Sequence, residues 1–311
     1  MVITLGLWWP TQPSPEAAPL RPPPVTLAPE LLEKYAEEPQ ISVYDHSIAA
    51  RRSMGIESYL LGVVNAETVP DWKTATLEAQ AIVARTFTIR SMEEADNTPR
   101  VLHGTDACTS KDHFQAYEQR GISDDIRAAV ENTRGLVLAY EDHIALTYFS
   151  SSSGGMTASL LEGFPDSPHR APYLESVPSR DQEIAPDYAA DWKTRVTRAR
   201  LRSLLGRRAL NASEVSVESR GESGRATVIR VGRRLVPAAE LRTLLGPEVL
   251  RSTMITDITV GRTHVTFTGV GWGHGVGLDQ WGAEAMARDG SSYLEILEHY
   301  LPGTRLVRLW D

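Results

Sequence analysis

Residues 271–283 constrain the fold of this chain more than any other segment. They read Gly-Trp-Gly-His-Gly-Val-Gly-Leu-Asp-Gln-Trp-Gly-Ala and enclose a single histidine, His274. Alternating glycines permit positive φ angles and let main-chain amides come close to a bound molecule, whereas they weaken the interior of a strand. We therefore expect a surface that grips a flat, polar ligand. A glycine-rich turn around a structural histidine is the alternative.

Size and charge exclude several classes of protein. The chain has 311 residues, of which 41% are hydrophobic and 23% charged, as in a globular protein with one large domain or two ordinary ones. Its formal net charge is -8, and an acidic chain repels phosphate backbones, so we expect no nucleic-acid partner. It has no run of about 18 apolar residues, so we expect no transmembrane segment.

The chain contains one cysteine, Cys108, and so cannot form an intrachain disulfide. Any staple must be a metal ion or packing, and the cysteine count leaves the compartment open. Cys108 lies in a polar segment with His103, Asp106 and His113. Thiolate, imidazole and carboxylate are all zinc donors, although this spacing matches no standard zinc finger. A buried free cysteine beside unrelated histidines is the alternative.

The N-terminal segment differs in composition from the rest. Residues 3–9 are apolar but too short for a secretory signal with its flanks. Residues 10–29 carry eight prolines, which predicts an extended tether. Such tethers are common in exported proteins whose signal or anchor is absent or removed. We therefore expect residues 1–38 to lie outside the fold.

Periodicity predicts an α+β fold with mixed, mainly antiparallel strands and packed helices around a groove, because helices and strands alternate without regular βαβ units. We expect a core made of residues 39–189 and 251–311, with an inserted small subdomain at 190–250. Expected helices cover residues 55–66, 74–93, 126–133, 192–206, 238–245, 280–288 and 292–300. Expected strands lie at 41–44, 136–140, 144–150, within 215–231 and within 255–270.

Glu67 is the candidate for acid–base chemistry. It falls at the break between the first two predicted helices, where the negative end of the helix dipole raises a carboxyl pKa slightly. Apolar neighbours would raise it further by desolvation, as a general acid requires. An ordinary exposed glutamate is the alternative. Arg85, on the second helix, could orient a carboxylate or a sugar hydroxyl, or could make a surface salt bridge.

Residues 148–157 form a serine–glycine block that offers hydroxyls and amides to a ligand, or else a flexible turn. The block lacks the G-x-S-x-G elbow, so a serine hydrolase is only weakly supported. Its candidate binding residues are Tyr148, Ser151, Ser152, Ser153, Gly154, Gly155 and Thr157.

Four ordered blocks of this sequence resemble the stage II sporulation protein D family, which includes the amidase enhancers. They are residues 55–67, which end in Glu67, residues 77–86, residues 148–157, and residues 271–304. The resemblance begins near Ile41 and runs almost to the end of the chain. Two positions depart from the family pattern. Two residues separate Glu67 from Pro70, where the family usually has one, and Glu78 stands where the family often has lysine.

The resemblance implies peptidoglycan glycan strands as the substrate and, in enzymatic members, lytic transglycosylation in an extracytoplasmic compartment. It implies that Glu67 is the general acid/base and that zinc binds near the groove through Cys108 and His113, with His103 and Asp106 as further candidates. Substrate contacts would come from Arg85, the serine–glycine block, Gly273, His274, Gly275 and Gln280.

Two other functions remain open at this stage. The first is a binding module that holds glycan without cutting it and stimulates a cell-wall amidase. The second is a zinc amidase at Cys108 and His113.

Overall fold

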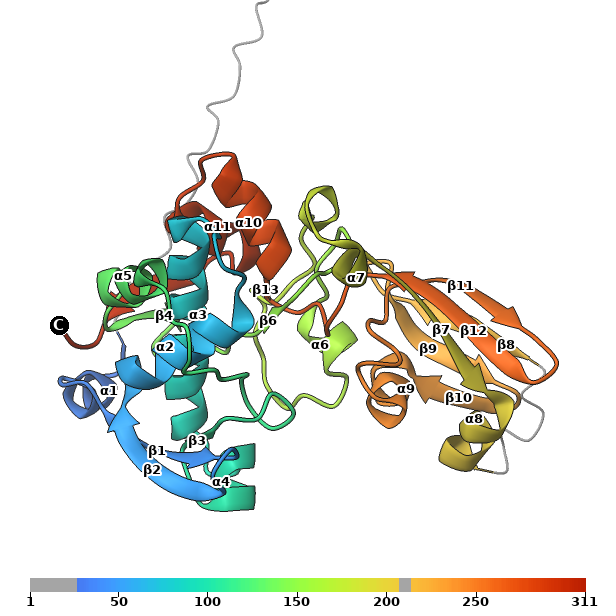
Figure 1. The fold of residues 1–311 in the computed structure, drawn as a ribbon, viewed down its shortest axis with the longest axis horizontal. Coiled ribbons are helices and arrows are strands. Elements are labelled where there is room, and N and C mark those ends of the chain that lie inside the picture. The colour runs from blue at the N-terminus through green and yellow to red at the C-terminus, as the bar shows by residue number, and fades with distance from the viewer. Residues whose placement is uncertain (1–26, 207–213) are drawn as a thin grey trace, which may run out of the picture.

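The computed structural model describes residues 27–206 and 214–311. Its small, mainly antiparallel sheets, packed with helices, confirm the α+β class. The elements form a helix-rich part and a strand-rich part, joined by a region of loops and short elements (Figure 1).

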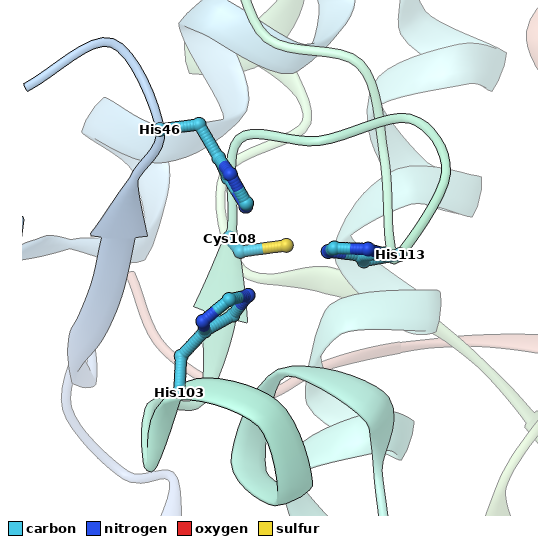
Figure 2. A group of neighbouring side chains, drawn as sticks. All are labelled: His46, His103, Cys108 and His113. Atoms are coloured by element: carbon cyan, nitrogen blue, oxygen red, sulfur yellow. The ribbon is translucent and has the colours of Figure 1, made fainter. Parts of the chain in front are cut away.

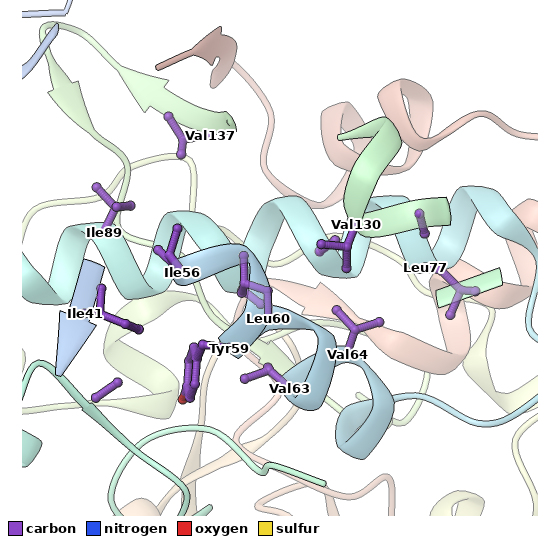
Figure 3. Packing of buried hydrophobic residues seen from close by; sticks show 14 of the residues in the cluster. Ile41, Ile56, Tyr59, Leu60, Val63, Val64, Leu77, Ile89, Val130 and Val137 are labelled. Atoms are coloured by element: carbon purple, nitrogen blue, oxygen red, sulfur yellow. The ribbon is translucent and has the colours of Figure 1, made fainter. Parts of the chain in front are cut away.

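Helix α3 (Thr74–Glu93) is the centre of the helix-rich part. It contacts α2 (Ile56–Glu67), α5 (Asp124–Asn132) and strand β4 (Leu136–Tyr140). Buried residues occur on all sides of α3, which is typical of a helix inside a core. Figure 3 shows the apolar side chains of α2 packed beside this helix. The first two predicted helices are therefore confirmed to within a residue at each end.

Short sheets surround this core. Strand β1 (Gln40–Asp45) pairs antiparallel with β2 (Ala50–Gly55) on one edge and parallel with β3 (Ala107–Cys108) on the other. Strand β4 pairs with β14 (Arg305–Arg308) and with β5. The remaining elements of this part are α4 (Thr98–His103), β5 (His143–Ile144), η1 (Asp181–Glu183), α10 (Gln280–Arg288) and α11 (Tyr293–Tyr300). Helices α6 (Leu160–Gly163) and α7 (Asp187–Ala190) lie in the joining region, and α7 contacts strand β7 (Asp191–Thr197) of the strand-rich part (Figure 1).

The serine–glycine block and the glycine-rich segment lie side by side. Strand β6 (Phe149–Ser150) pairs parallel with β13 (Leu278–Asp279), and isolated bridges join Ser152 to Trp272 and Ala158 to Val276. Gly277 adopts φ +76°, and a Cβ there would collide with the carbonyl oxygen of Tyr148. The glycines therefore let two backbones of the chain meet.

The strand-rich part has its own hydrophobic cluster, with buried residues from Trp192 to Phe267. The expected helix at 192–206 is wrong over residues 192–197, which form a strand paired with β12 (His264–Val270). In this strand Trp192 and Val196 are buried against the cluster. The elements are β7 (Asp191–Thr197), α8 (Arg198–Leu205), β8 (Val215–Arg220), β9 (Ala226–Val231), β10 (Arg234–Pro237), α9 (Ala238–Leu245), β11 (Ile255–Val260) and β12 (His264–Val270). The division of the chain at 190 and 250 stays a prediction.

The segment before β1 differs from the expectation. Residues 1–26 of the predicted tether lie outside the described residues, but residues 27–38 belong to the fold. Helix α1 (Pro29–Lys34) is followed by Tyr35, which is 1% exposed and whose hydroxyl donates to Glu93. The proline-rich composition predicted a tether, but Leu27 and Tyr35 are buried in the core and hold this segment against it. No helix of the described residues is long and apolar enough to cross a membrane.

Candidate functional site

Glu67 is the last residue of α2, which ends because the backbone turns extended at Thr68, ahead of Pro70. One oxygen of its half-buried carboxyl group accepts a hydrogen bond from the Ala116 amide at 2.7 Å. Burial raises the pKa of Glu67, since desolvation disfavours the charged form. The Ala116 amide, the Gln280 side chain and the charge of Lys111 oppose this rise only in part.

Glu67 lines a cavity of about 400 Å³, called here the acid cavity. It lies between the helix-rich part and the loop after α9, and Phe149, Phe164 and Trp272 supply aromatic surface. Ser150 adds a polar group to its lining. The structure thus brings together seven of the residues that the sequence singled out, namely Glu67, His113, Tyr148, Ser151, Gly273, His274 and Gln280.

His274 is fixed within the wall of this cavity. Its Nδ1 accepts from the Val276 amide at 3.1 Å, and the ring also hydrogen-bonds the backbone of Phe149. Burial and two nearby arginines lower the pKa of His274 to about 3, so the ring is neutral near pH 7. Its ring lies against those of Tyr148 and Phe164. His274 therefore contributes an aromatic surface to the cavity.

The other predicted residues of the serine–glycine block bind the protein itself. The amides of Gly154 and Gly155 each donate to Asp181 at 2.8 Å, and the Ser153 amide donates to Asp279 at 2.9 Å. The hydroxyl of Ser152 donates to Asp181. Two further predicted residues also contact other parts of the protein. Thr157 is buried and its hydroxyl accepts from the Val177 amide, and Gly275 faces the guanidinium of Arg225.

Arg85 does not reach a ligand surface. Its side chain is 0% exposed and forms a bidentate pair with Glu57, with Arg85 nitrogens 2.7 and 3.0 Å from the carboxylate oxygens. It also donates to the carbonyl oxygens of Leu136 and Val130. The prediction that Arg85 contacts substrate is therefore wrong. The partner is 28 residues away on α2, so the spacing of charges along one helix could not reveal it.

A second cavity of about 540 Å³, called here the side cavity, adjoins the acid cavity. The two share Tyr148, Phe164, Arg242 and His274. The side cavity is otherwise lined mainly by residues 163–169 and by one face of α9. Sequence patterns gave no signal for Phe164 or Arg242, because both come from segments whose periodicity indicates only loop and helix.

Four side chains near the acid cavity form a cluster of metal-binding type (Figure 2). His46, His103, Cys108 and His113 each direct a donor atom to a common point, and these atoms all lie within 4.8 Å of one another. His46 was missed by the sequence analysis. It follows β1, and the parallel pairing of Tyr44 with Cys108 brings it beside the cysteine.

Asp106, by contrast, lies outside this group. Its carboxylate accepts from the Ser42 amide at 2.9 Å and pairs with Arg100 at 3.2 Å. The structure therefore replaces Asp106 with His46 in the predicted donor set.

The cluster has the chemistry of a zinc site. His103 Nε2 and His113 Nδ1 are buried and have no hydrogen-bond partner among the described residues, and buried polar atoms in native proteins rarely stay unpaired. Three imidazoles and one thiolate are ligands that zinc takes in closed tetrahedral sites. The donor set therefore fits zinc.

Comparison with known proteins identifies the family to which this fold and site belong. The family model described as SpoIID, Stage II sporulation protein, matches residues 44–140. Stage II sporulation protein D of Bacillus amyloliquefaciens is 32% identical over 289 residues, which cover 88% of this chain and 80% of that protein. Stage II sporulation protein D of Bacillus subtilis is 31% identical, over 86% of this chain and 78% of the relative. The chain belongs to the stage II sporulation protein D family.

A further relative has a different name. The amidase enhancer of Bacillus subtilis is 29% identical over 298 residues, which cover 80% of this chain but 40% of the relative.

Proposed function

We propose that this protein acts on peptidoglycan and cleaves its glycan strands by lytic transglycosylation, with Glu67 as the only acid/base. The observation that carries the proposal is the half-buried Glu67 carboxyl group, whose pKa is raised, in a cavity with aromatic walls and hydroxyl groups. Aromatic faces and polar groups together suit the apolar faces and hydroxyl rim of a sugar ring. The family names of the relatives support a role in the cell wall.

In the proposed reaction, protonated Glu67 gives its proton to the glycosidic oxygen as the bond to C1 of the muramoyl unit breaks. The 6-hydroxyl oxygen of the same unit then bonds to C1, and its proton returns to Glu67. The products are a 1,6-anhydro sugar and a new chain end, and no water is consumed. One carboxyl group suffices because the substrate supplies the second nucleophile, in contrast to hydrolytic glycosidases.

The Ala116 amide holds Glu67 in place, and this amide belongs to the loop that follows the metal-binding cluster. We propose that zinc binds His46, His103, Cys108 and His113 and stabilises this loop. Four protein donors leave no open position, which is typical of a structural zinc site and unlike a catalytic one. This arrangement favours the glycan-cleaving reading over a zinc amidase.

Replacement of the acid tests the proposal. Glu67→Gln keeps the shape of the side chain and an oxygen that accepts from the Ala116 amide, but removes the titratable proton. We expect release of anhydro-muropeptides from purified sacculi, measured by mass spectrometry, to fall by about a hundredfold to ten-thousandfold. Glu78→Gln is the matched control, because Glu78 hydrogen-bonds Asn132 at the surface. Undiminished release by Glu67→Gln would remove the proposal.

A second candidate function follows from the relative named amidase enhancer. In it, the same cavity holds glycan and the protein stimulates a cell-wall amidase without cutting the strand. The same variants separate the two functions. Sedimentation with sacculi, no soluble product from the wild type, and stimulation of an amidase that survives Glu67→Gln would favour the enhancer. Either function places the protein outside the cytoplasm, where peptidoglycan is found.

A further inference from the structure

Arg242 occupies a special place between the two cavities. It comes from α9 in the strand-rich part, and it lines both the acid cavity and the side cavity. The other three residues common to both cavities are the rings of Tyr148, Phe164 and His274, and the histidine is neutral. Arg242 is thus the single charged group that a ligand spanning the two cavities would meet at their junction.

The guanidinium of Arg242 has only part of its hydrogen-bonding capacity in use. Its Nε donates to the Arg251 carbonyl oxygen at 3.2 Å, whereas within residues 27–206 and 214–311 its two Nη atoms have no hydrogen-bond or salt-bridge partner. Burial lowers the pKa of Arg242, and the charge of Glu248 opposes this only in part. The side chain is half-buried and its Nη atoms are not sealed from solvent, so they can bind a ligand that enters either cavity.

Two of the acids that line the cavities are already engaged with other cations. Glu248, in the acid cavity, pairs with Lys111 at 2.9 Å, and Glu240, in the side cavity, lies 3.5 Å from Arg234. The bond from Nε to a backbone carbonyl fixes the plane of the guanidinium and leaves the Nη atoms for a ligand. The planar guanidinium can donate two parallel hydrogen bonds to the two oxygens of a carboxylate.

We propose that Arg242 determines specificity by binding a carboxylate carried by the glycan strand beside the bond that Glu67 cleaves. This inference rests on the proposed function. Peptidoglycan offers such a group from two sources. The muramoyl unit has a lactyl carboxylate when it bears no peptide, and the peptide has its own carboxylates when the lactyl group is amidated.

Binding measurements on the full-length chain with Glu67→Gln, which prevents turnover, test the inference. The probes are a muramoyl tetrasaccharide with free lactyl carboxylates, its methyl ester, and the peptide-bearing tetrasaccharide, each titrated by calorimetry. We expect the free acid to bind about tenfold more tightly than the ester, as for a charge-assisted hydrogen bond. Adding Arg242→Gln should abolish that difference, and Arg242→Lys should retain only part of it because lysine lacks the fork.

Arg233→Gln is the matched control, since Arg233 is an exposed arginine of the same part and lines neither cavity. It should leave the ratio of the two affinities unchanged. If Arg242→Gln lowers the affinity only for the peptide-bearing probe, the peptide is the source of the carboxylate and the inference stands. Equal effects of Arg242→Gln on acid, ester and peptide-bearing probe, with the thermal transition unchanged, would overturn it.

Failure of the proposed function has a different signature. Absence of anhydro product from the wild type, with the acid-over-ester preference intact, would remove the transglycosylase and leave Arg242 as a carboxylate-binding residue. Tetrasaccharide binding and cleavage without any dependence on Arg242 would remove only the inference. No binding of any tetrasaccharide would overturn both.

Discussion

Burial acts in opposite directions on the two titratable residues that the sequence placed in one site. It raises the pKa of the Glu67 carboxyl group and lowers that of the His274 imidazole to about 3. In both cases burial favours the neutral form of the side chain over the charged form. A neutral carboxylic acid can give a proton, whereas an imidazole with a pKa of about 3 is neutral near pH 7 and is too weak a base to take one up. Of these two residues, Glu67 is therefore the one suited to the proton transfer of the proposed reaction.

Asp279 provides a pH prediction at the same scale. It is fully buried beneath the serine–glycine block, and burial followed by the charge of Asp181 raises its pKa to about 7. An unfolded aspartate has a pKa near 3.9, so between about pH 4 and pH 7 the folded state holds a proton that the unfolded state has lost. Its contribution to stability is complete below that range and declines as the pH rises through it.

We therefore expect Asp279→Asn, which stays neutral at every pH, to gain stability relative to the wild type as the pH rises from about 4 to about 7. The measurement is the free energy of unfolding in urea at several pH values, taken as the difference between the two proteins. Carboxylates whose pKa is lowered, such as Asp45 and Glu162, make the fold more stable as the pH rises. Both proteins contain them, so their contribution cancels in the difference. A difference that is constant over this range would show that Asp279 is ionised in the folded protein.

At the scale of elements, the segment from α4 to Ala116 is held by few regular hydrogen bonds. It contains the two-residue strand β3 and three of the four donors of the metal-binding cluster. We expect the purified protein to contain about one zinc ion per chain. Chelation should lower the thermal transition and increase amide hydrogen exchange in residues 103–117, because the proposed zinc would hold together donors from separate segments of the chain.

Cys108→Ser should reproduce the effect of chelation without a chelator. Asp106→Asn is the control, since the structure places Asp106 on Ser42 and Arg100 outside the cluster, and its metal content should match the wild type. Full zinc content in Cys108→Ser, or unchanged exchange after chelation, would contradict the assignment.

The elements also show how far the sequence alone can lead. Local periodicity predicted α2 and α3 because their signals lie within one helix. It failed at residues 192–197, where pairing with β12 decides the conformation. The wrong role predicted for Arg85 and the omission of His46 have a related cause. Their partners, Glu57 and Cys108, are brought to them by helix packing and by parallel strand pairing, and neither arrangement leaves a periodic signal. Glu67 could be singled out as a candidate from the sequence because a helix break and apolar neighbours are local features.

At the scale of the whole molecule, the buried Arg225 joins the strand-rich part to the serine–glycine block. Arg225 immediately precedes β9 and its Nη2 donates to the carbonyl oxygen of Ser153 in the serine–glycine block. Burial lowers the pKa of Arg225 to about 10, while Asp279, Glu162 and Asp181 favour its charged form. The hydrogen bond from Arg225 thus links the strand-rich part, which also contains α9 and Arg242, to the serine–glycine block.

Removal of this arginine should loosen the two parts from each other. Arg225→Ala leaves the carbonyl oxygens of Ser153 and Met156 without their donor, and a buried polar group left unpaired costs about 1 to 3 kcal/mol. We expect the free energy of unfolding to fall by this amount and calorimetry to resolve separate transitions for the two parts, because the hydrophobic cluster from Trp192 to Phe267 can persist by itself. Arg230→Ala is the control, since Arg230 pairs with Glu218 at the surface of the same sheet, and its transition should match the wild type. A single, unshifted transition in Arg225→Ala would mean that the two parts are held together by their apolar contacts and that Arg225 has no share in the geometry of the site.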